Sequence, residues 1–114
     1  MDMFCLMTAS RAALVNRFPS GHQNAARMDR NAAKLQQMGV TVTRIDLADT
    51  RFSSYTNGLI VNRTAIVPTF GRTSTDSAAL AAYRAAGYRA VGVDCRRIIQ
   101  WSGAVHCITI TVPR

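Results

Sequence analysis

The sequence predicts an α/β protein built from a repeated unit of two strands, a helix and a third strand. Three polar residues, Asp2, Asn57 and Cys107, each begin a short apolar run and are separated by 55 and 50 residues along the 114-residue chain. The same order of strand-like and helix-like segments follows the first two of them. A period of about fifty residues is typical of repeat and propeller architectures. We therefore expect two ββαβ units and the first strand of a third.

The first unit covers roughly the first 45 residues. Residues 3–7 and 12–15 are short apolar runs that predict strands, and residues 40–45 predict a third strand. Between them, residues 24–38 predict a helix that ends at Gly39, because glycine favours the left-handed conformation after a helix. The apolar residues of this helix share one stripe at helical spacing: Ala25, Met28, Ala32, Leu35 and Met38.

The second unit repeats this order, and a third unit begins after it. Residues 58–61, 64–67 and 88–93 predict strands, and residues 77–86 predict an alanine-rich helix with Asp76 as its N-cap and Gly87 beyond its end. Residues 107–112 alternate between apolar and polar side chains, which predicts the opening strand of a third copy. No linker divides the chain, so we expect one domain or part of one.

Composition limits the classes of protein to consider. Hydrophobic residues make up 48% of the chain, which is enough for a core. No apolar run approaches the ~20 residues of a membrane span, and no signal peptide begins the chain. The sequence therefore predicts a cytoplasmic protein with no membrane partner. Its three cysteines match no zinc-ligand spacing and cannot all pair, so we expect free thiols, one of them reactive.

The net charge of +8 and the pI near 10.7 raise the alternative of nucleic-acid binding. The distribution of the charges argues against a nucleic-acid partner. The arginines are scattered, Arg96 and Arg97 are their only adjacent pair, and no aromatic residues alternate with a basic stripe. We interpret the excess of arginine over lysine as a compositional bias.

The three repeat openings suggest a reactive site. On a strand, neighbouring side chains point to opposite faces, so we expect His106 and Cys107 not to form a dyad. If the units surround a common axis, Asp2, Asn57 and Cys107 converge there as a carboxylate, an amide and a thiol. A cysteine becomes a good nucleophile when a nearby cation or base favours the thiolate, and a cationic substrate held by Asp2 could supply that help.

Plainer interpretations compete with this hypothesis at each position. Cys107 on an apolar strand is consistent with a small core residue, and Asp2 with a solvated terminus. Asn57 followed by Gly58 is a common turn pair. Trp101 is consistent with an anchor for its loop. The joint occurrence of these residues at the repeat spacing favours the site.

Several segments resemble one enzyme family. Residues 105–109 read V-H-C-I-T after Gly103 and resemble the I-H-C-I-T signature of the agmatine deiminase and bacterial (Porphyromonas-type) peptidylarginine deiminase family. Residues 54–57 (S-Y-T-N), 59–62 (L-I-V-N), 67–71 (V-P-T-F-G) and 93–96 (V-D-C-R) resemble further motifs of that family, and residues 2–4 resemble the end of its H-x-D-M-F motif. The motifs run the whole length of the chain in the family's order.

The resemblance implies a fold and a reaction. The fold is a partial pentein-type α/β propeller, with residues 1–114 as the C-terminal fragment of a single deiminase domain. The reaction is hydrolysis of a guanidinium C–N bond, as in agmatine plus water giving N-carbamoylputrescine and ammonia, a step of putrescine and polyamine biosynthesis. By resemblance Cys107 is the nucleophile, Asp2 grips the guanidinium group, and Asn57 is an active-site amide that also contacts the substrate. The resemblance implies no cofactor and no metal.

Other possibilities stay open. The histidine of H-x-D has no counterpart in this sequence, so we expect the chain alone to be inactive. The small guanidinium substrate is agmatine, free arginine or a peptide arginine. A non-catalytic module that forms homo-oligomers or binds a partner through exposed edges, and a basic nucleic-acid binder, are the alternatives.

Overall fold

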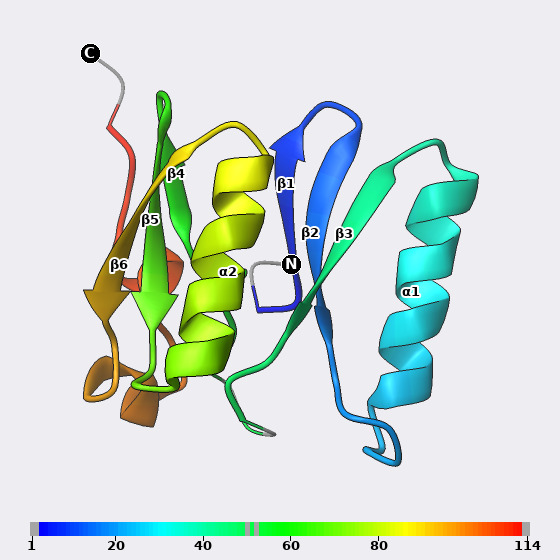
Figure 1. Ribbon diagram of the computed structural model, residues 1–114, viewed down its shortest axis with the longest axis horizontal. Coiled ribbons are helices and arrows are strands. Elements are labelled where there is room, and N and C mark those ends of the chain that lie inside the picture. Colours follow the sequence, from blue (N-terminus) through cyan, green and yellow to red (C-terminus); the bar gives the residue numbers. More distant parts are fainter. Residues whose placement is uncertain (1–2, 50, 52, 113–114) are drawn as a thin grey trace.

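A computed structural model describes residues 3–49, 51 and 53–112, and these residues form two ββαβ units (Figure 1). The elements of the first unit are β1 (Cys5–Ala9), β2 (Ala12–Arg17), α1 (Ala25–Gln37) and β3 (Thr41–Asp46). Those of the second are β4 (Leu59–Val61), β5 (Thr64–Thr69), α2 (Thr73–Ala85) and β6 (Arg89–Asp94). Two short 3₁₀ turns follow, η1 (Ile98–Trp101) and η2 (His106–Ile108). The predicted α/β class and both repeats are confirmed.

Each unit carries a three-stranded sheet with its second strand in the centre. The strand orders are β1-β2-β3 and β4-β5-β6. In each sheet the first two strands form an antiparallel hairpin. The second and third strands are parallel, and the helix is the crossover connection between them. Both helices end at a glycine with positive φ, Gly39 and Gly87, as their positions in the sequence predicted.

The strand register corrects one step of the repeat argument. Leu6 pairs with Leu14 in the first hairpin, and Leu59 pairs with Ile66 in the second. When the two units are aligned by these pairs, Phe4 is the counterpart of Asn57. Equal spacing had assigned that place to Asp2, which lies outside the described residues, and the assignment was wrong by two positions.

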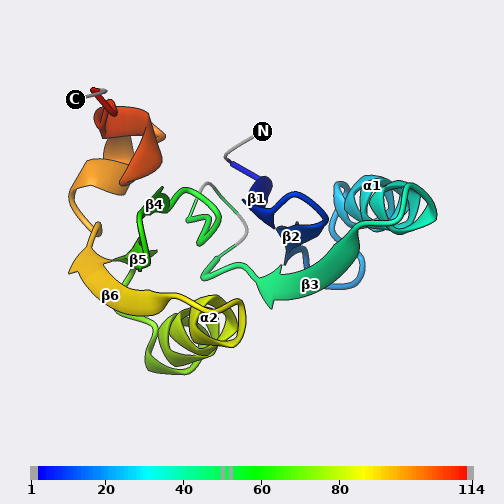
Figure 2. The ribbon, with the colours of Figure 1, turned by 90° about the horizontal axis from the view of Figure 1, so that it is seen from above.

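The core joins the two units through α2. This helix packs on its own sheet and also contacts β3 of the first unit, whereas α1 lies on the other side of the first sheet (Figure 2). The larger cluster of buried residues therefore combines Leu14 and Ile45 of the first unit with Ala79 and Tyr83 of α2. A second cluster lies between α1 and its sheet, around Met28. Within the described residues, no helix is long and apolar enough to cross a membrane.

The predicted opening strand of a third unit does not form. Cys107 lies in η2, and residues 109–112 belong to no sheet of the described chain. Ile108, Ile110 and Val112 are 61%, 88% and 79% exposed. Alternation of apolar and polar side chains favours a strand only where a neighbouring strand supplies hydrogen bonds and covers the apolar side. In the described part of the chain no strand lies there.

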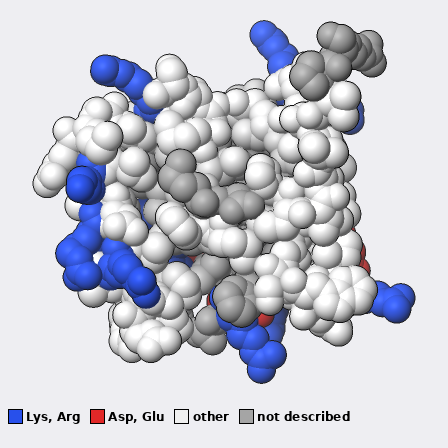
Figure 3. Space-filling model, turned by 180° about the vertical axis from the view of Figure 1, so that it is seen from behind, with Lys and Arg blue, Asp and Glu red and all other residues white. Residues whose placement is uncertain are grey.

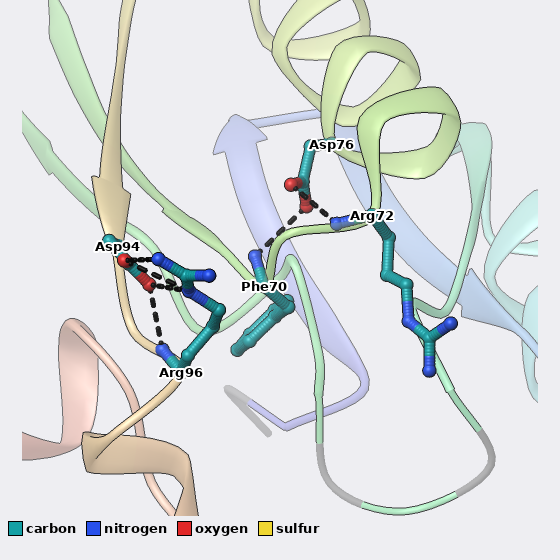
Figure 4. Close-up of polar contacts among 5 residues, drawn as sticks. All are labelled: Phe70, Arg72, Asp76, Asp94 and Arg96. Atoms are coloured by element: carbon teal, nitrogen blue, oxygen red, sulfur yellow. Dashed lines mark hydrogen bonds and ion pairs between the residues drawn. The ribbon is translucent and has the colours of Figure 1, made fainter.

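The prediction for the start of the second helix was also wrong. Helix α2 begins at Thr73 and its N-cap residue is Arg72, so Asp76 lies inside the first turn. Its carboxylate reaches back and accepts hydrogen bonds from the backbone N–H groups of Phe70 and Arg72, both at 3.0 Å (Figure 4). Asp76 therefore stabilises the helix N-terminus from within the helix, where a negative charge is also favoured by the helix dipole.

Candidate active site

Cys107 lies on a short, exposed 3₁₀ turn near the end of the chain. The three cysteines form no disulfide bond, as predicted, within the described part of the chain, and Cys107 is exposed whereas Cys5 and Cys95 are buried. The interpretation of Cys107 as a core residue is therefore wrong. Thr109 closes the turn, since its Oγ1 donates to the carbonyl oxygen of Val105 at 2.8 Å. The thiol is thus presented at the surface by a turn that is itself hydrogen-bonded.

Asn57 is fully buried beneath this turn and contacts it at several atoms. Its Nδ2 donates to Cys107 Sγ at 2.9 Å and lies 3.1 Å from Met3 Sδ. Its Oδ1 accepts from the backbone N–H groups of Ala104 (3.0 Å) and Cys107 (3.3 Å). An asparagine side chain offers two N–H donors and one oxygen with two lone pairs. All four positions are occupied, so Asn57 fixes both the thiol and its backbone.

The main chain of Asn57 also holds the turn, and a proline makes this possible. The His106 N–H donates to the Asn57 carbonyl oxygen at 3.0 Å. In the first unit the counterpart carbonyl, that of Phe4, accepts instead from Asn16 N–H across the hairpin at 2.9 Å. The residue in the place of Asn16 is Pro68, which has no N–H. The carbonyl oxygen of Asn57 therefore accepts no hydrogen bond from Pro68 and is available to the N–H of His106.

Gly103 allows the loop to approach the thiol. A Cβ atom at this position would lie 2.9 Å from Cys107 Cβ and 3.6 Å from Sγ. Because the first distance is shorter than carbon atoms tolerate, any larger residue would displace the cysteine. The neighbouring Trp101, expected as a loop anchor, is 83% exposed, so that interpretation is wrong.

The segment that carries Asn57 is anchored by two buried tyrosines. Tyr83 of α2 donates its hydroxyl to the carbonyl oxygen of Tyr55 at 2.7 Å, and Tyr55 donates its own hydroxyl to Asp76 at 2.6 Å. Burial raises the pKa of both tyrosines well above the ordinary value, and for Tyr55 the neighbouring Asp76 carboxylate adds to the effect. Both hydroxyls therefore stay protonated and keep donating at all physiological pH values.

Asn16 connects this segment to the start of the chain. It is fully buried in β2, and its Nδ2 donates to the Met3 carbonyl oxygen (2.7 Å) and to Ser54 Oγ (2.6 Å). Its Oδ1 has no hydrogen-bond partner among the described residues. A polar residue inside an otherwise apolar strand was a visible signal that the sequence interpretation passed over.

Other titratable groups near the loop are structural in character. Burial raises the pKa values of the Cys5 and Cys95 thiols, which makes them poor nucleophiles. The exposed carboxylate of Asp94 is held by the Arg96 side chain and backbone, and these bonds lower its pKa to about 2 (Figure 4). No group of three or more His, Cys, Asp or Glu side chains in the described chain could hold a metal ion.

A cavity lies beside the site, at the same end of the sheets. It encloses about 600 Å³ between the start of β1, the N-terminal part of α1 and the loop after β3, and it is lined by Met3 and Ser54 among others. Its charged lining residues are Arg27 and Arg51, and none of its described lining residues is acidic. Within the described residues, the lining therefore carries positive charge and offers no carboxylate to a guanidinium group.

Basic side chains are distributed unevenly over one face of the molecule. Figure 3 shows several Lys and Arg side chains gathered on the side of α1 and others standing singly around the outline of this face. Some arginines are paired with aspartates, including Arg17 with Asp46 (2.6 Å) and Arg44 with Asp29 (2.9 Å).

Of the three predicted site residues, the structure brings Asn57 and Cys107 into direct contact. Asp2 lies outside the described residues. The roles of Pro68 and Gly103 were not predicted from the sequence. Pro68 affects the carbonyl group of Asn57, which is distant in the sequence, and Gly103 lies against Cys107 only because the loop folds back.

Comparison with known proteins defines the class to which this fold and loop belong. The sequence profile of the Porphyromonas-type peptidyl-arginine deiminase family matches residues 2–113. A protein named "Putative agmatine deiminase" from Marinomonas sp. (strain MWYL1) is 37% identical over 62 residues, which are 54% of this chain and 17% of that protein. The chain belongs to the Porphyromonas-type peptidyl-arginine deiminase family.

Solved structures show the same fold. A structure titled "Putative Arginine Deiminase from Porphyromonas gingivalis" superposes with a TM-score of 0.84 at 21% identity over 99% of this chain and 38% of that one. The agmatine deiminase of C. jejuni gives 0.78 at 16% identity, over 93% of this chain and 36% of that one. The predicted partial pentein-type fold is confirmed, and the chain spans less than two fifths of the length of these relatives.

Proposed function

We propose that this chain is the C-terminal portion of a guanidine-modifying hydrolase of the agmatine deiminase type, with Cys107 as its nucleophile. The observation that carries the proposal is the contact between the exposed Cys107 thiol and the buried Asn57 amide. Membership of a deiminase family supports the reaction class. The motif similarity around residues 105–109 supports the role of the cysteine.

The reaction follows from the thiol and a planar cation. Cys107 Sγ forms a bond to the guanidinium carbon, one C–N bond breaks, and the departing nitrogen takes up a proton and leaves as ammonia. Water then adds to the same carbon and the thiol departs, which leaves a ureido product. Asn57 holds the sulfur in place through the hydrogen bond from its Nδ2 to Sγ at 2.9 Å.

Asn57 acts as a positioning residue in this proposal. Its Nδ2 hydrogens and its Oδ1 lone pairs are all engaged within the protein. It orients the thiol and has no hydrogen-bonding group left for a substrate. Asp2 remains the predicted carboxylate for the guanidinium group.

The chain alone is expected not to turn over substrate. Neither of its histidines, His22 and His106, stands in the H-x-D motif that the family resemblance requires. Proton transfer to the leaving nitrogen and from water needs a general acid and base, which this resemblance assigns to that histidine. The substrate class is a small guanidinium compound, agmatine or an arginine derivative, and the expected compartment is the cytoplasm.

Alkylation with 2-chloroacetamidine tests the nucleophile. This electrophile carries a planar amidinium group, and a thiolate displaces its chloride. Peptide mass mapping should place the adduct on Cys107, with Cys5 and Cys95 unmodified, and Cys107→Ser should abolish it. An adduct that forms no faster than with glutathione, or that forms equally on all three cysteines, would contradict the proposal. A parallel assay for ammonia release from agmatine should detect no turnover by the 114-residue chain.

A further inference from the structure

Asn57 is followed by glycine, and this pair can modify itself chemically. The side-chain carbonyl carbon of an asparagine can be attacked by the backbone nitrogen of the next residue, and glycine permits the closest approach because it has no Cβ. Asn57 is the only one of the five asparagines in the sequence that precedes a glycine, the others being Asn16, Asn24, Asn31 and Asn62. The residue that contacts the Cys107 thiol is therefore also the one most prone to this reaction.

The folded structure restrains the groups that would have to move. Attack makes the side-chain carbon of Asn57 tetrahedral, and the side-chain nitrogen must then leave as ammonia. This nitrogen, Nδ2, is held between Cys107 Sγ (2.9 Å) and Met3 Sδ (3.1 Å). The side-chain oxygen accepts hydrogen bonds from the N–H groups of Ala104 and Cys107. The residue is also fully buried, so the reaction requires the turn around Cys107 (residues 104–109) to open locally and admit water.

The nitrogen of Gly58, which would attack, is not used by the hairpin of the second unit. In an antiparallel pair, the N–H and C=O groups of alternate residues face the partner strand and those of the residues between them point away. The carbonyl of Phe4, the counterpart of Asn57, faces β2 and accepts from Asn16. In the same register the N–H of Gly58, one residue further, points away from β5. No hydrogen bond of the hairpin has to break for Gly58 to react.

We propose that Asn57 and Gly58 form a self-modification site that reacts when the turn around Cys107 opens, and that the reaction makes this opening permanent. The Gly58 nitrogen bonds to the side-chain carbonyl carbon of Asn57, and the bond from that carbon to Nδ2 breaks. The proton of the Gly58 N–H leaves with Nδ2 as ammonia. Water then opens the cyclic imide at one of its two carbonyl groups, which leaves aspartate or isoaspartate at position 57. Water is the only other reactant.

Neither product fits the native turn. In the aspartate product an oxygen takes the place of Nδ2, so the donor to both sulfur atoms is lost and a negative charge lies beside Cys107 Sγ, where it opposes formation of a thiolate. In the isoaspartate product the main chain before Gly58 is longer by one carbon. A Cβ on Gly58 would already lie 2.7 Å from the Tyr83 hydroxyl and 3.0 Å from the Ile66 carbonyl oxygen. A displaced backbone therefore has no room there, and the turn does not re-form.

Peptide mapping tests the reactivity and its protection by the fold. The chain is incubated without substrate at mildly alkaline pH, either folded or in urea, and mass spectrometry follows the conversion of each asparagine. In urea, Asn57 should be modified at least tenfold faster than Asn31 or Asn62, which precede residues with a Cβ. In the folded chain, modification of Asn57 should be at least tenfold slower than in urea. Equal rates at the three asparagines in urea, or modification of the folded chain as fast as in urea, would overturn the proposal.

Two glycine substitutions separate opening of the turn from unfolding of the whole chain. Gly103→Ala places a methyl group 2.9 Å from Cys107 Cβ and disturbs the turn itself. Gly87→Ala strains the backbone after α2, where φ is +95°, with nothing within 4 Å of the added Cβ. The two variants are compared at urea concentrations that give them equal free energies of unfolding. Gly103→Ala should then modify Asn57 at least fivefold faster, and equal rates would refute control by the turn.

The permanence of the opening is measured on aged protein of the unaltered sequence. Both products carry one negative charge more than the intact chain, so ion exchange isolates the modified fraction. The amides of residues 104–107 in this fraction should have lost their protection against deuterium exchange, whereas the paired amides of β5 and β6 should keep theirs. Unchanged protection of the turn would overturn the proposal.

The modification is independent of the proposed catalytic role of Cys107. Cys107→Ser should still be modified at Asn57, because the reaction uses no thiol, and each modified chain should release one ammonia in the absence of agmatine. A Cys107→Ser chain that stays intact in urea would overturn the mechanism. Failure of the alkylation test with 2-chloroacetamidine would leave these outcomes unchanged, so the two proposals can be refuted separately.

Discussion

Replacement of Asn57 by alanine should strongly destabilise the chain. The substitution removes the acceptor for two backbone N–H groups and the donor to two sulfur atoms. Ala104 is fully buried, so its N–H loses its partner without access to water, whereas the N–H of the exposed Cys107 can be hydrated. An unsatisfied buried donor costs about 1–3 kcal/mol. Together with the space left by the amide, we expect a loss of about 2–4 kcal/mol.

Equilibrium urea unfolding measures this loss. Asn31→Ala is the matched control, because Asn31 is exposed on α1 and the same change there should alter stability by about 0.5 kcal/mol or less. A domain of this size has about 5–15 kcal/mol in total, so the effect at Asn57 should shift the midpoint clearly. The reasoning about the turn would be refuted by a loss below about 1 kcal/mol, or by one equal to that of the control.

Three further substitutions probe the support of the site. Gly103→Ala should lower the free energy of unfolding by about 1–3 kcal/mol, because the added methyl group would lie 2.9 Å from the cysteine Cβ. The same substitution should slow the alkylation of Cys107 by iodoacetamide. Unchanged alkylation would mean that the loop adapts. Pro68→Ala introduces an N–H that shares the carbonyl accepting from His106, so the His106 amide should exchange with deuterium about fivefold faster, the equivalent of about 1 kcal/mol; Pro19→Ala should leave it unchanged. Burial raises the pKa of Tyr83 above its value of about 10 in the unfolded chain, so the contribution of Tyr83 to stability should be constant below pH 10 and fall above it. Urea unfolding at pH 9 to 11.5 should show a smaller fall for Tyr83→Phe, and equal slopes would contradict the assignment.

The sequence predicted the repeated architecture because local signals determine it. Apolar periodicity defined the first helix and alanine content the second, and Gly39 and Gly87 ended them where a left-handed residue was needed. The failures concern interactions that are not local. Residues 107–112 have the pattern of a strand, but a pattern does not supply a neighbouring strand. Asp76 has the chemistry of an N-cap, but its carboxylate bonds to Phe70 and Arg72 from inside the helix.

The site was predictable in part for the same reason. The proximity of Asn57 and Cys107 followed from the repeat and the motif similarity, and the structure places the two side chains in contact. The counting that suggested it was inexact, because in the strand register Phe4, and not Asp2, is the counterpart of Asn57. No spacing rule could reveal that the missing N–H of Pro68 leaves a carbonyl group for the cysteine loop. That arrangement exists only once both chain segments have folded.

The position of the single tryptophan has a practical consequence. Trp101 ends η1, six residues before Cys107, and its indole ring is 83% exposed. Its emission therefore arises from one water-contacting fluorophore six residues from Cys107 in the sequence, at a wavelength where tyrosine contributes little. Covering of this region should shift the emission to the blue, and an acceptor dye attached at Cys107 should quench it. The chain thus contains its own optical reporter, and loop movement can be followed in real time without adding a donor label.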